Sequence, residues 1–215
     1  MQVHIIGGGI IGLSAAAYLR ERGAEVTVLE AGDFHDGCSF GNAGLVVPSH
    51  FVPLAAPGVV AKGLRWMFRP SSPFFIHPRW DPQLLRWLWR FWRACRPETA
   101  ERAMPLLRDF NLLSLECYRQ WVREGLDCAF EEKGMLMLCR TARAEREELE
   151  AAEKANALGI EARVLSPADA GELEPGIPMN IRRAVFYPGD THLHPGLLME
   201  RLRERVRGLG VQLLP

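Results

Sequence analysis

The chain has 215 residues, with 26 basic and 26 acidic side chains, so its formal net charge is zero. This balance gives no electrostatic argument for a nucleic-acid partner. Five cysteines are irregularly spaced with no C-x-x-C pair, which argues against a zinc motif and predicts reduced thiols in a cytoplasmic protein. No apolar run reaches the roughly 18 residues of a membrane-spanning helix. The first predicted strand starts at the N-terminus, so we expect no signal peptide.

The first 30 residues carry the strongest motif of the chain. Residues Val3–Ile6 form a mostly apolar run that predicts a buried parallel strand, and Gly7, Gly9 and Gly12 follow with the G-x-G-x-x-G spacing. In a dinucleotide-binding turn, the first glycine permits a sharp turn and the second permits close approach of a pyrophosphate. The third permits close packing of the following helix on the sheet.

The context of this motif is that of a βαβ unit. A helix rich in small residues is predicted to end at Gly23, and a second apolar strand, Val26–Leu29, is followed by Glu30. Glu30 stands 18 residues after Gly12 and can accept hydrogen bonds from ribose hydroxyls. A glycine-rich turn without a ligand is the alternative. The agreement of strand, turn, helix and acid favours a nucleotide cofactor.

After Glu30 the chain departs from the pattern of nicotinamide enzymes. Residues 31–57 are rich in Gly, Pro, Ser and Asn, which predicts a loop where a third strand would be expected. Many flavoproteins leave the nucleotide domain early in this way, so FAD is favoured over NAD. Within this loop, residues 37–50 carry small polar side chains and further glycines that suit contact with a pyrophosphate or flavin, although a plain surface loop fits equally well.

Residues 42–68, NAGLVVPSHFVPLAAPGVVAKGLRWMF, together with the glycine motif and YPGDTHLHPGLLMERL at 187–202, resemble the FAD-dependent D-amino-acid dehydrogenases of the small-subunit type. These enzymes belong to the D-amino-acid oxidase and glycine oxidase superfamily. The resemblance implies a non-covalent FAD and oxidation of a D-amino acid to an imino acid, with electrons passed to the respiratory chain. The residues that it implies for the ADP half are Gly7, Gly9, Ile10, Ile11, Gly12, Glu30 and Ala31, and those near the pyrophosphate and flavin are Ser39, Asn42, Ala43 and Gly44.

The expected fold class is α/β, or α+β overall, with a Rossmann-like FAD-binding βαβ unit and part of a substrate domain built from antiparallel strands and helices. We predict an FAD-binding segment at 1–58, a substrate domain at 59–187 and a return to the FAD-binding domain at 188–215. The relatives are substantially longer, so the chain is expected to be an N-terminal portion. Catalytic residues are therefore not assigned.

Residues 59–97 combine eight basic side chains, one acid and five of the six tryptophans. The predicted helix QLLRWLWRFWRAC places Gln83, Arg86, Arg90 and Arg93 on one narrow polar stripe. Burial in the core is the first expectation for so apolar a helix. The alternative is peripheral membrane contact through residues 82–95, at the inner face of the cell membrane, with the arginines at lipid headgroups.

The later elements are predicted from local signals. We predict a core helix at Pro105–Glu124 and a hairpin at 128–140 that turns at Lys133 and Gly134. A further helix is predicted at 141–158, with Thr141 as its N-terminal cap. A short helix should start at Ser166–Pro167 and another near Pro195. Residues 211–214 predict a further strand of the nucleotide sheet. On the helix expected at 105–124, the residues that should face the core are Leu106, Phe110, Leu113, Cys117 and Trp121.

Asp190, His192 and His194 lie close together in the sequence and raise the question of a metal site. A turn before a helix fits better, because metal-binding histidines need further ligands and a scaffold. We therefore predict no metal. The functional alternatives are an oxidase that uses oxygen, an inactive FAD-binding fragment and, more distantly, a nicotinamide dehydrogenase. The expected partner is a small amino acid or secondary amine, and self-association is left open.

Overall fold

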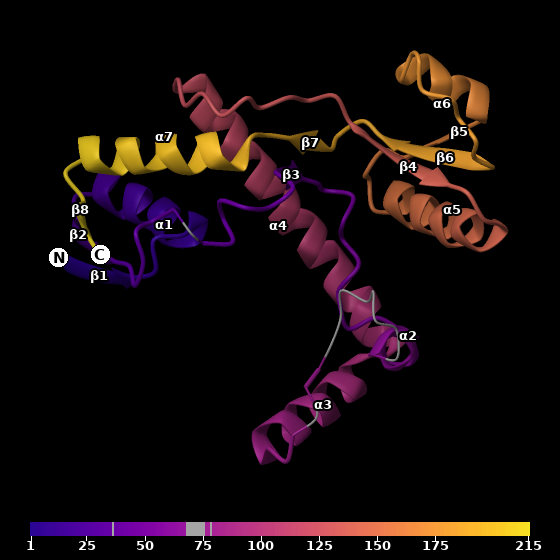
Figure 1. Ribbon diagram of the computed structural model, residues 1–215, viewed down its shortest axis with the longest axis horizontal. Helices are drawn as coiled ribbons and strands as arrows, with labels where there is room; N and C mark the ends of the chain where they lie inside the picture. Colours follow the sequence, from indigo (N-terminus) through magenta and orange to yellow (C-terminus); the bar gives the residue numbers. More distant parts are fainter. Residues whose placement is uncertain (36, 68–75, 78) are drawn as a thin grey trace.

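The computed structural model describes residues 1–35, 37–67, 76–77 and 79–215. Its strands form a parallel sheet of order β1-β2-β8, a short antiparallel pair β3-β7, and an antiparallel sheet of order β4-β6-β5. Figure 1 shows the two three-stranded sheets at opposite ends of the molecule, with the pair β3-β7 between them. This mixed architecture confirms the expected fold class. The predicted domain boundaries at 58 and 187 stay predictions.

The parallel sheet consists of β1 (Gln2–Ile6), β2 (Glu25–Leu29) and β8 (Gln212–Leu214). Helix α1 (Ile10–Glu21) connects the first two strands, and α7 (Pro195–Gly208) leads into the third. β2 pairs in parallel with β1 on one side and with β8 on the other. The strand predicted from the last residues therefore does extend the nucleotide sheet, as expected.

Helices α1 and α7 contact each other over one face of this sheet. The core between them is made of small and branched side chains, with Leu13, Ala16, Leu202 and Val206 fully buried, and Val28 of β2 beneath them. In the described chain no helix covers the opposite face, where residues of β1 and β2 are exposed in alternation. The first strand is parallel, as predicted, but the expectation that it is buried is wrong, because none of its residues is fully buried and only Val3 and Ile5 pack partly against the core.

The second sheet consists of β4 (Met135–Cys139), β6 (Arg183–Tyr187) and β5 (Arg163–Leu165), all paired antiparallel. Helices α5 (Ala142–Ala157) and α6 (Pro167–Leu173) accompany it. Antiparallel strands were expected in the predicted substrate domain, but the pairing of β4 with β6 was not expected.

The hairpin predicted at 128–140 is wrong. Gly134 takes a positive φ of 79° and does turn the chain, but β4 pairs with β6. The segment before the turn makes only an isolated bridge, in which Glu131 faces His192. A local pattern of apolar residues and a turn cannot specify a partner strand that lies 48 positions further along, from Met135 to Arg183.

Helix caps predicted from the sequence are present. The Thr141 hydroxyl accepts a hydrogen bond from the N–H of Ala144 at the start of α5. Ser166 and Asp169 form a reciprocal capping box at the start of α6. Helix α7 begins at Pro195, as predicted, and its cap is His194, whose Nδ1 accepts from the N–H of Leu197.

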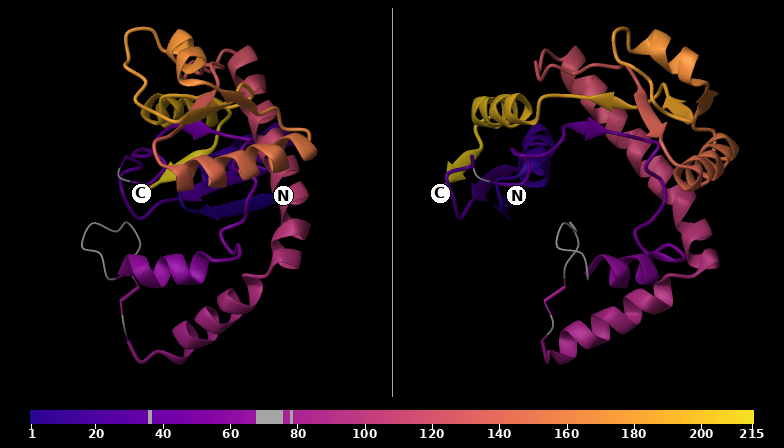
Figure 2. Two further views of the ribbon diagram at one scale, coloured as in Figure 1. Left: turned by 90° about the vertical axis from the view of Figure 1, so that its right-hand side faces the viewer. Right: turned by 45° about the vertical axis from the view of Figure 1, so that its right-hand side comes forward.

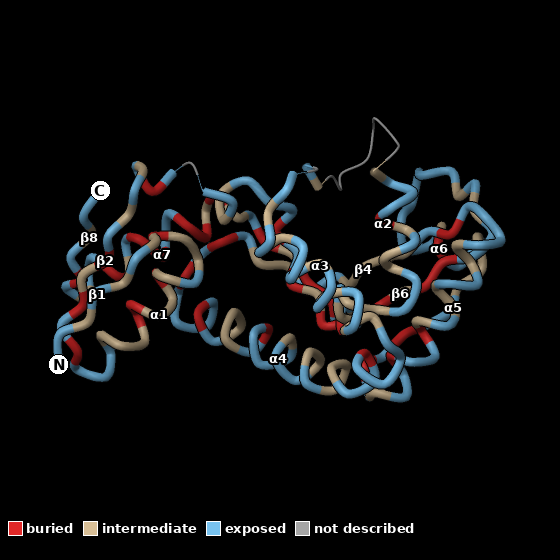
Figure 3. The backbone as a smooth tube through the Cα atoms, turned by 90° about the horizontal axis from the view of Figure 1, so that it is seen from below, coloured by how far each residue is buried: buried red, intermediate tan, exposed pale blue. Residues whose placement is uncertain are grey.

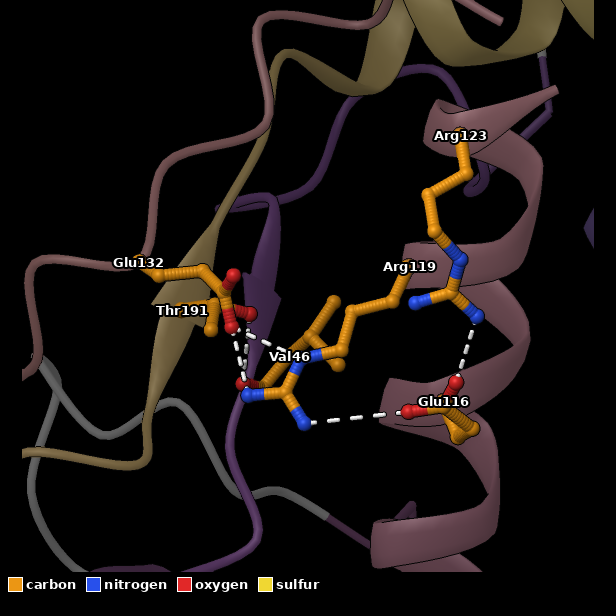
Figure 4. A network of polar contacts seen from close by, with 6 residues as sticks. All are labelled: Val46, Glu116, Arg119, Arg123, Glu132 and Thr191. Carbon is orange, nitrogen blue, oxygen red and sulfur yellow. Dashed lines mark hydrogen bonds and ion pairs between the residues drawn. The ribbon is translucent and has the colours of Figure 1, made fainter. Parts of the chain in front are cut away.

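The strands β3 (Leu45–Val46) and β7 (Thr191–His192) join the two ends of the molecule. Figure 4 shows Thr191, whose buried hydroxyl donates to the carbonyl of Val46 at 3.1 Å. Neighbouring Asp190 is also buried and accepts from both the N–H and the hydroxyl of Ser49. The sequence predicted only loops in this region, because a strand of two residues such as β3 leaves no periodic signal.

Helix α4 (Pro97–Arg123) is the longest element and passes alongside β3. It starts eight residues before Pro105, which lies inside the helix and not at its first turn, so the predicted start was wrong. Arg119 of α4 forms an ion pair with Glu132 before β4, and Arg123 pairs with Glu116 (Figure 4). These exposed pairs each contribute little to stability.

The apolar face predicted for α4 is buried only near its C-terminal end. Trp121 is buried, whereas Leu106, Phe110 and Leu113 are 58%, 60% and 61% exposed. The amphipathic pattern was therefore right, and the expected burial was wrong for the first half of the helix.

Helices α2 (Val59–Met67) and α3 (Pro82–Ala94) precede α4. Asp81 caps α3 by accepting from the N–H groups of Gln83 and Leu84. No residue of α3 is buried, which contradicts the expectation that this helix lies in the core. Figures 1 and 2 show α3 projecting from the start of α4, away from both larger sheets, and Figure 3 shows it free of buried residues.

Candidate functional site

The turn between β1 and α1 requires glycine at two positions. Gly7 has a φ of 106°, a conformation that other residues rarely adopt, and its N–H donates to the carbonyl of Leu29 at 2.8 Å. At Gly12, a Cβ atom would lie 1.9 Å from the carbonyl oxygen of Gly7. The helix can therefore start this close to the strand only without a side chain at residue 12.

The N-terminus of α1 offers hydrogen-bond donors. Gly9 occupies the cap position, and no side chain caps the helix from there. The N–H of Ile10 donates to the hydroxyl of Ser39 at 3.0 Å. Among the described residues, no acceptor bonds the N–H groups of Gly9, Ile11 or Gly12. Free N–H groups and the positive end of the helix dipole suit an anion such as a pyrophosphate.

Glu30 lies at the end of β2, beside this turn. Its carboxylate accepts from the N–H groups of Gly8, Ala31 and Gly32 at 2.5, 2.8 and 3.4 Å. These backbone hydrogen bonds, led by that from Gly8, lower the pKa of the half-buried Glu30 carboxyl group below its ordinary value. Glu30 is therefore an ionised, acceptor-only group, which is what ribose hydroxyls require.

Asn42 builds the loop that follows. Its Nδ2 donates to the carbonyls of Cys38 and Ser39, and its Oδ1 accepts from the N–H of Gly44 at 2.8 Å. The amide is therefore engaged within the loop, and its role is to shape the backbone around Ser39. A direct flavin contact by this side chain stays a prediction.

Gly44 is where the loop meets the rest of the fold. It has a φ of 66°, and a Cβ atom there would lie 2.0 Å from the carbonyl oxygen of Leu193. The N–H of Leu193 donates to the Gly44 carbonyl at 2.9 Å, next to the β3-β7 pair. The loop is thereby fixed at one end to α1 through Ser39 and at the other end to the segment that leads into α7.

The structure brings most of the predicted residues to one turn. Gly7, Gly9, Gly12, Glu30 and Ser39 surround the N-terminus of α1. Three further predicted residues have exposed apolar side chains, namely Ile11, Ala31 and Ala43.

Three residues at this turn were not predicted from the sequence, namely Gly8, Phe34 and Arg203. Phe34 is buried at a positive φ of 68°, and its ring occupies the space in which a side chain on Gly8 would stand, 2.3 Å from a Cβ atom there. Arg203 of α7 is buried and donates to the carbonyl of Phe34 at 3.2 Å. The extra glycine in the run Gly7–Gly9 was the one available signal, since it indicates that the middle position is also crowded.

The acidic and histidine residues near α7 serve the fold. Asp190 bonds Ser49, His194 caps α7, and His192 lies 3.8 Å from Glu131. In the part of the chain that the structure describes, no group of three or more His, Cys, Asp or Glu residues could hold a metal ion.

The geometry of the turn fits a dinucleotide. A cradle without side chains lies at Gly7 and Gly9, unbonded helix amides face it, and an ionised carboxylate stands at the end of the neighbouring strand. Comparison with known proteins agrees with this. The family described as FAD dependent oxidoreductase matches residues 2–215.

Two curated relatives cover nearly the whole chain. A D-amino acid dehydrogenase of Helicobacter pylori is 32% identical over 213 residues, which are 99% of this chain and 51% of the relative. A D-amino acid dehydrogenase of Methylobacterium radiotolerans is 34% identical over 223 residues, covering 98% of this chain and 52% of the relative. The chain therefore spans about half the length of the curated relatives that it matches.

Solved structures show the same fold. Glycine oxidase from Geobacillus kaustophilus has a TM-score of 0.62 at 20% identity and covers 98% of this chain and 45% of its own. L-α-glycerophosphate oxidase from Mycoplasma pneumoniae, solved with FAD bound, has a TM-score of 0.62 at 18% identity, over 99% of this chain and 44% of its own. The match over residues 2–215, together with the glycine turn and its surroundings, shows that the chain belongs to the FAD dependent oxidoreductases, a family defined by FAD as its cofactor.

Proposed function

We propose that the chain forms the nucleotide-binding part of an enzyme that oxidises D-amino acids, or secondary amines like D-proline, to imino acids. The observation that carries the proposal is the identity of 30–34% to relatives named D-amino acid dehydrogenase. The aligned ranges cover 98–99% of the chain, so they include the glycine turn, the Ser39 loop and the segment that leads into α7.

In this proposal the ADP half of FAD is held at the β1–α1 turn. Glu30 accepts hydrogen bonds from the ribose hydroxyls, and the N–H groups of Ile11 and Gly12 face the pyrophosphate. Ser39 and Asn42 keep the loop beside that helix end. When bound, FAD supplies the acceptor for the hydride that leaves the substrate α-carbon. Water then converts the imino acid to a keto acid and ammonia.

No residue of this chain is assigned a catalytic role. Asp190 accepts a hydrogen bond from Ser49 and His194 caps α7, so both side chains serve the fold. Substrate choice is likewise not assigned to any side chain here. The curated relatives are about twice as long as the chain. The activity of the whole enzyme should therefore be measured on the protein expressed from the complete reading frame.

The experiment is a substrate panel on the protein expressed from its complete reading frame. Purified protein loaded with FAD should reduce an artificial electron-acceptor dye with D-alanine or D-proline and not with the L-enantiomers. The matched control is Gly12→Ala, which places a Cβ atom 1.9 Å from the Gly7 carbonyl and should abolish the reaction. FAD binding without dye reduction by any D-amino acid would reject the proposed reaction and favour an FAD-binding protein without this activity.

An oxidase that passes electrons to oxygen is the second candidate. The chain shares its fold with glycine oxidase, at 20% identity. Release of hydrogen peroxide in step with substrate consumption would identify an oxidase. Turnover that needs the dye and yields no peroxide would identify a dehydrogenase.

We also propose that electrons leave toward a carrier at the inner face of the cell membrane, which α3 contacts. Trp87 and Trp89 are each 52% exposed and Trp92 is 59% exposed. Arg86, Arg90 and Arg93 were predicted to lie on the polar stripe of the same helix. Exposed aromatic residues beside cations characterise helices that lie in a membrane interface. No helix within the described ranges is long and apolar enough to cross a bilayer.

A further inference from the structure

Arg203 of α7 is a buried cation, with 6% of its surface exposed. One of its terminal nitrogens, Nη1, donates to the Phe34 carbonyl at 3.2 Å and lies 2.7 Å from Nε2 of His35, which accepts when the ring is neutral. The guanidinium also stacks over the ring of Phe40, with 5.5 Å between Cζ and the ring centroid. Its other terminal nitrogen, Nη2, lies 3.4 Å from Nδ1 of the same His35. The guanidinium therefore contacts three residues of the loop after β2, namely Phe34, His35 and Phe40.

Two residues of the same loop, Phe34 and Ser39, contact the glycine turn. The ring of Phe34 fills the space beside Gly8, and the hydroxyl of Ser39 accepts from the N–H of Ile10. Phe34 holds its place at a positive φ, which is strained for a residue with a bulky side chain. A strained residue persists where the surroundings fix it, and the carbonyl bonded by Arg203 belongs to that same residue.

Among the described residues, no carboxylate balances the charge of Arg203. Within the part of the chain that the structure describes, no ion pair includes Arg203, and its buried Nε has no hydrogen-bond partner. Buried charges in proteins are normally paired, because removing an ion from water is costly. Arg203 contacts the loop that faces the N-terminus of α1. A buried cation there, with no carboxylate partner among the described residues, matches a ligand with negative charge at that helix end.

We propose that Arg203 is a positioning residue for the pyrophosphate of FAD. It holds Phe34 and Phe40 beside the glycine turn, and its positive charge acts on the pyrophosphate from the far side of these two residues. The inference rests on the proposed use of the β1–α1 turn for the ADP half of FAD. Arg203 lies far along the chain from Ile10 and outside the G-x-G-x-x-G motif.

The test compares nucleotide affinities of variants made in the complete reading frame. Arg203→Met removes the charge and the hydrogen bonds while keeping a long apolar side chain. Arg201→Met is the matched control, because Arg201 lies on the same helix, is exposed and pairs with Glu204. Apo-protein is titrated with FAD, ADP and adenosine by calorimetry, and thermal unfolding is measured without nucleotide.

We expect Arg203→Met to weaken FAD and ADP binding at least about 10-fold, which is about 1.4 kcal/mol. Adenosine binding should change less than about 2-fold, and Arg201→Met should leave all three affinities unchanged within that margin. The wild-type affinity for ADP should also fall more steeply with salt than that of Arg203→Met. Equal losses for adenosine and ADP would overturn the inference, since they would show general support of the loop.

A second variant keeps the inference testable if Arg203→Met does not fold. Arg203→Lys keeps the charge and should keep the preference for ADP over adenosine, and loss of that preference would contradict the inference. If the Arg203→Met variant folds and its FAD affinity is unchanged, the role of Arg203 is overturned, but the proposed function is not. Wild-type protein that binds neither FAD nor ADP would overturn the proposed function as well.

Asp36 directly follows His35 in the sequence, and it lies outside the described residues. A double-mutant cycle between Asp36→Asn and Arg203→Met tests whether it balances the charge. If the effects of the two substitutions on thermal unfolding of the apo-protein are additive, Asp36 does not pair with Arg203, which supports the pyrophosphate as the anion that balances the charge of Arg203. Non-additive effects would identify Asp36 as the partner and overturn the inference.

Discussion

The hydroxyl of Ser39 accepts a hydrogen bond from the backbone N–H of Ile10 at 3.0 Å, across 29 positions of sequence. This bond joins the loop after β2 to the first turn of α1. It leaves the next two N–H groups of the helix, those of Ile11 and Gly12, without an acceptor in the described chain. The loop and the helix end therefore form one surface, and the cofactor site depends on both.

Ser39→Ala should weaken FAD binding by about 3- to 10-fold, because one hydrogen bond contributes roughly 1 kcal/mol to holding the loop. Fluorescence titration of the apo-protein with FAD measures this. Ser114→Ala is the control, since Ser114 is exposed on α4 and makes no hydrogen bond within the described residues. Tighter binding by Ser39→Ala would show that the hydroxyl competes with the cofactor for the Ile10 N–H.

Gly12→Ala should destabilise the protein by about 1–3 kcal/mol and prevent FAD retention, because the new Cβ atom meets backbone that cannot move aside. Gly208→Ala is a matched control at the end of α7, where nothing lies within 4 Å of an added Cβ atom. That change should stabilise by about 0.5–1 kcal/mol. Thermal unfolding and flavin absorbance distinguish the two. Normal FAD retention by Gly12→Ala would exclude the turn as the pyrophosphate site.

The buried carboxyl group of Asp190 should make the stability of the fold depend on pH. Burial raises the pKa of this carboxyl group above the ordinary value of 3.8, and the hydrogen bonds from Ser49 oppose that shift. Because the folded state holds the proton more tightly than the unfolded state, this carboxyl contributes stability at low pH. That contribution is lost as the pH rises through the folded pKa.

Asp190→Asn should remove this pH dependence while keeping an acceptor for the N–H of Ser49. Urea unfolding between about pH 4 and about pH 8 should show the wild type losing stability relative to Asp190→Asn as the pH rises. A wild type that gains stability relative to the variant over that range would mean that the Ser49 bonds outweigh burial.

The exposed face of α3 gives a prediction on membrane contact. Changing Arg86, Arg90 and Arg93 to Ser should reduce sedimentation of the complete protein with anionic liposomes, because each cation near a charged surface contributes about 1 kcal/mol. The control changes Arg143, Arg146 and Arg163 to Ser, which alters net charge equally on and near α5. Equal sedimentation of the two triple variants would contradict a membrane role for α3.

The sequence predicts those parts of the fold that are specified locally. The βαβ unit around Gly7 and Gly12 follows from strand, turn and helix signals within 30 residues. The caps at Thr141 and Ser166 follow from side chains that bond the next turn of the same helix. Each of these needs only neighbours in the chain, so residue types and spacing suffice.

The features that the sequence does not predict depend on distant partners. β4 has the pattern of one strand of a hairpin, yet it pairs with β6, and no local pattern marks that choice. The strain at Phe34 and the burial of Arg203 arise from contact between α7 and a loop 169 positions away. The pattern on α3 predicted an apolar helix correctly, but periodicity does not identify what covers such a face.

FAD binding at the β1–α1 turn is tested most directly by flavin retention in the protein from its complete reading frame. Apo-protein is incubated with FAD, passed through gel filtration, and its visible flavin absorbance is compared with its protein concentration. We predict about one FAD per chain for the wild type and none for Gly12→Ala, whose Cβ atom would collide with the Gly7 carbonyl. A colourless wild type that takes up no FAD would contradict cofactor binding at this turn.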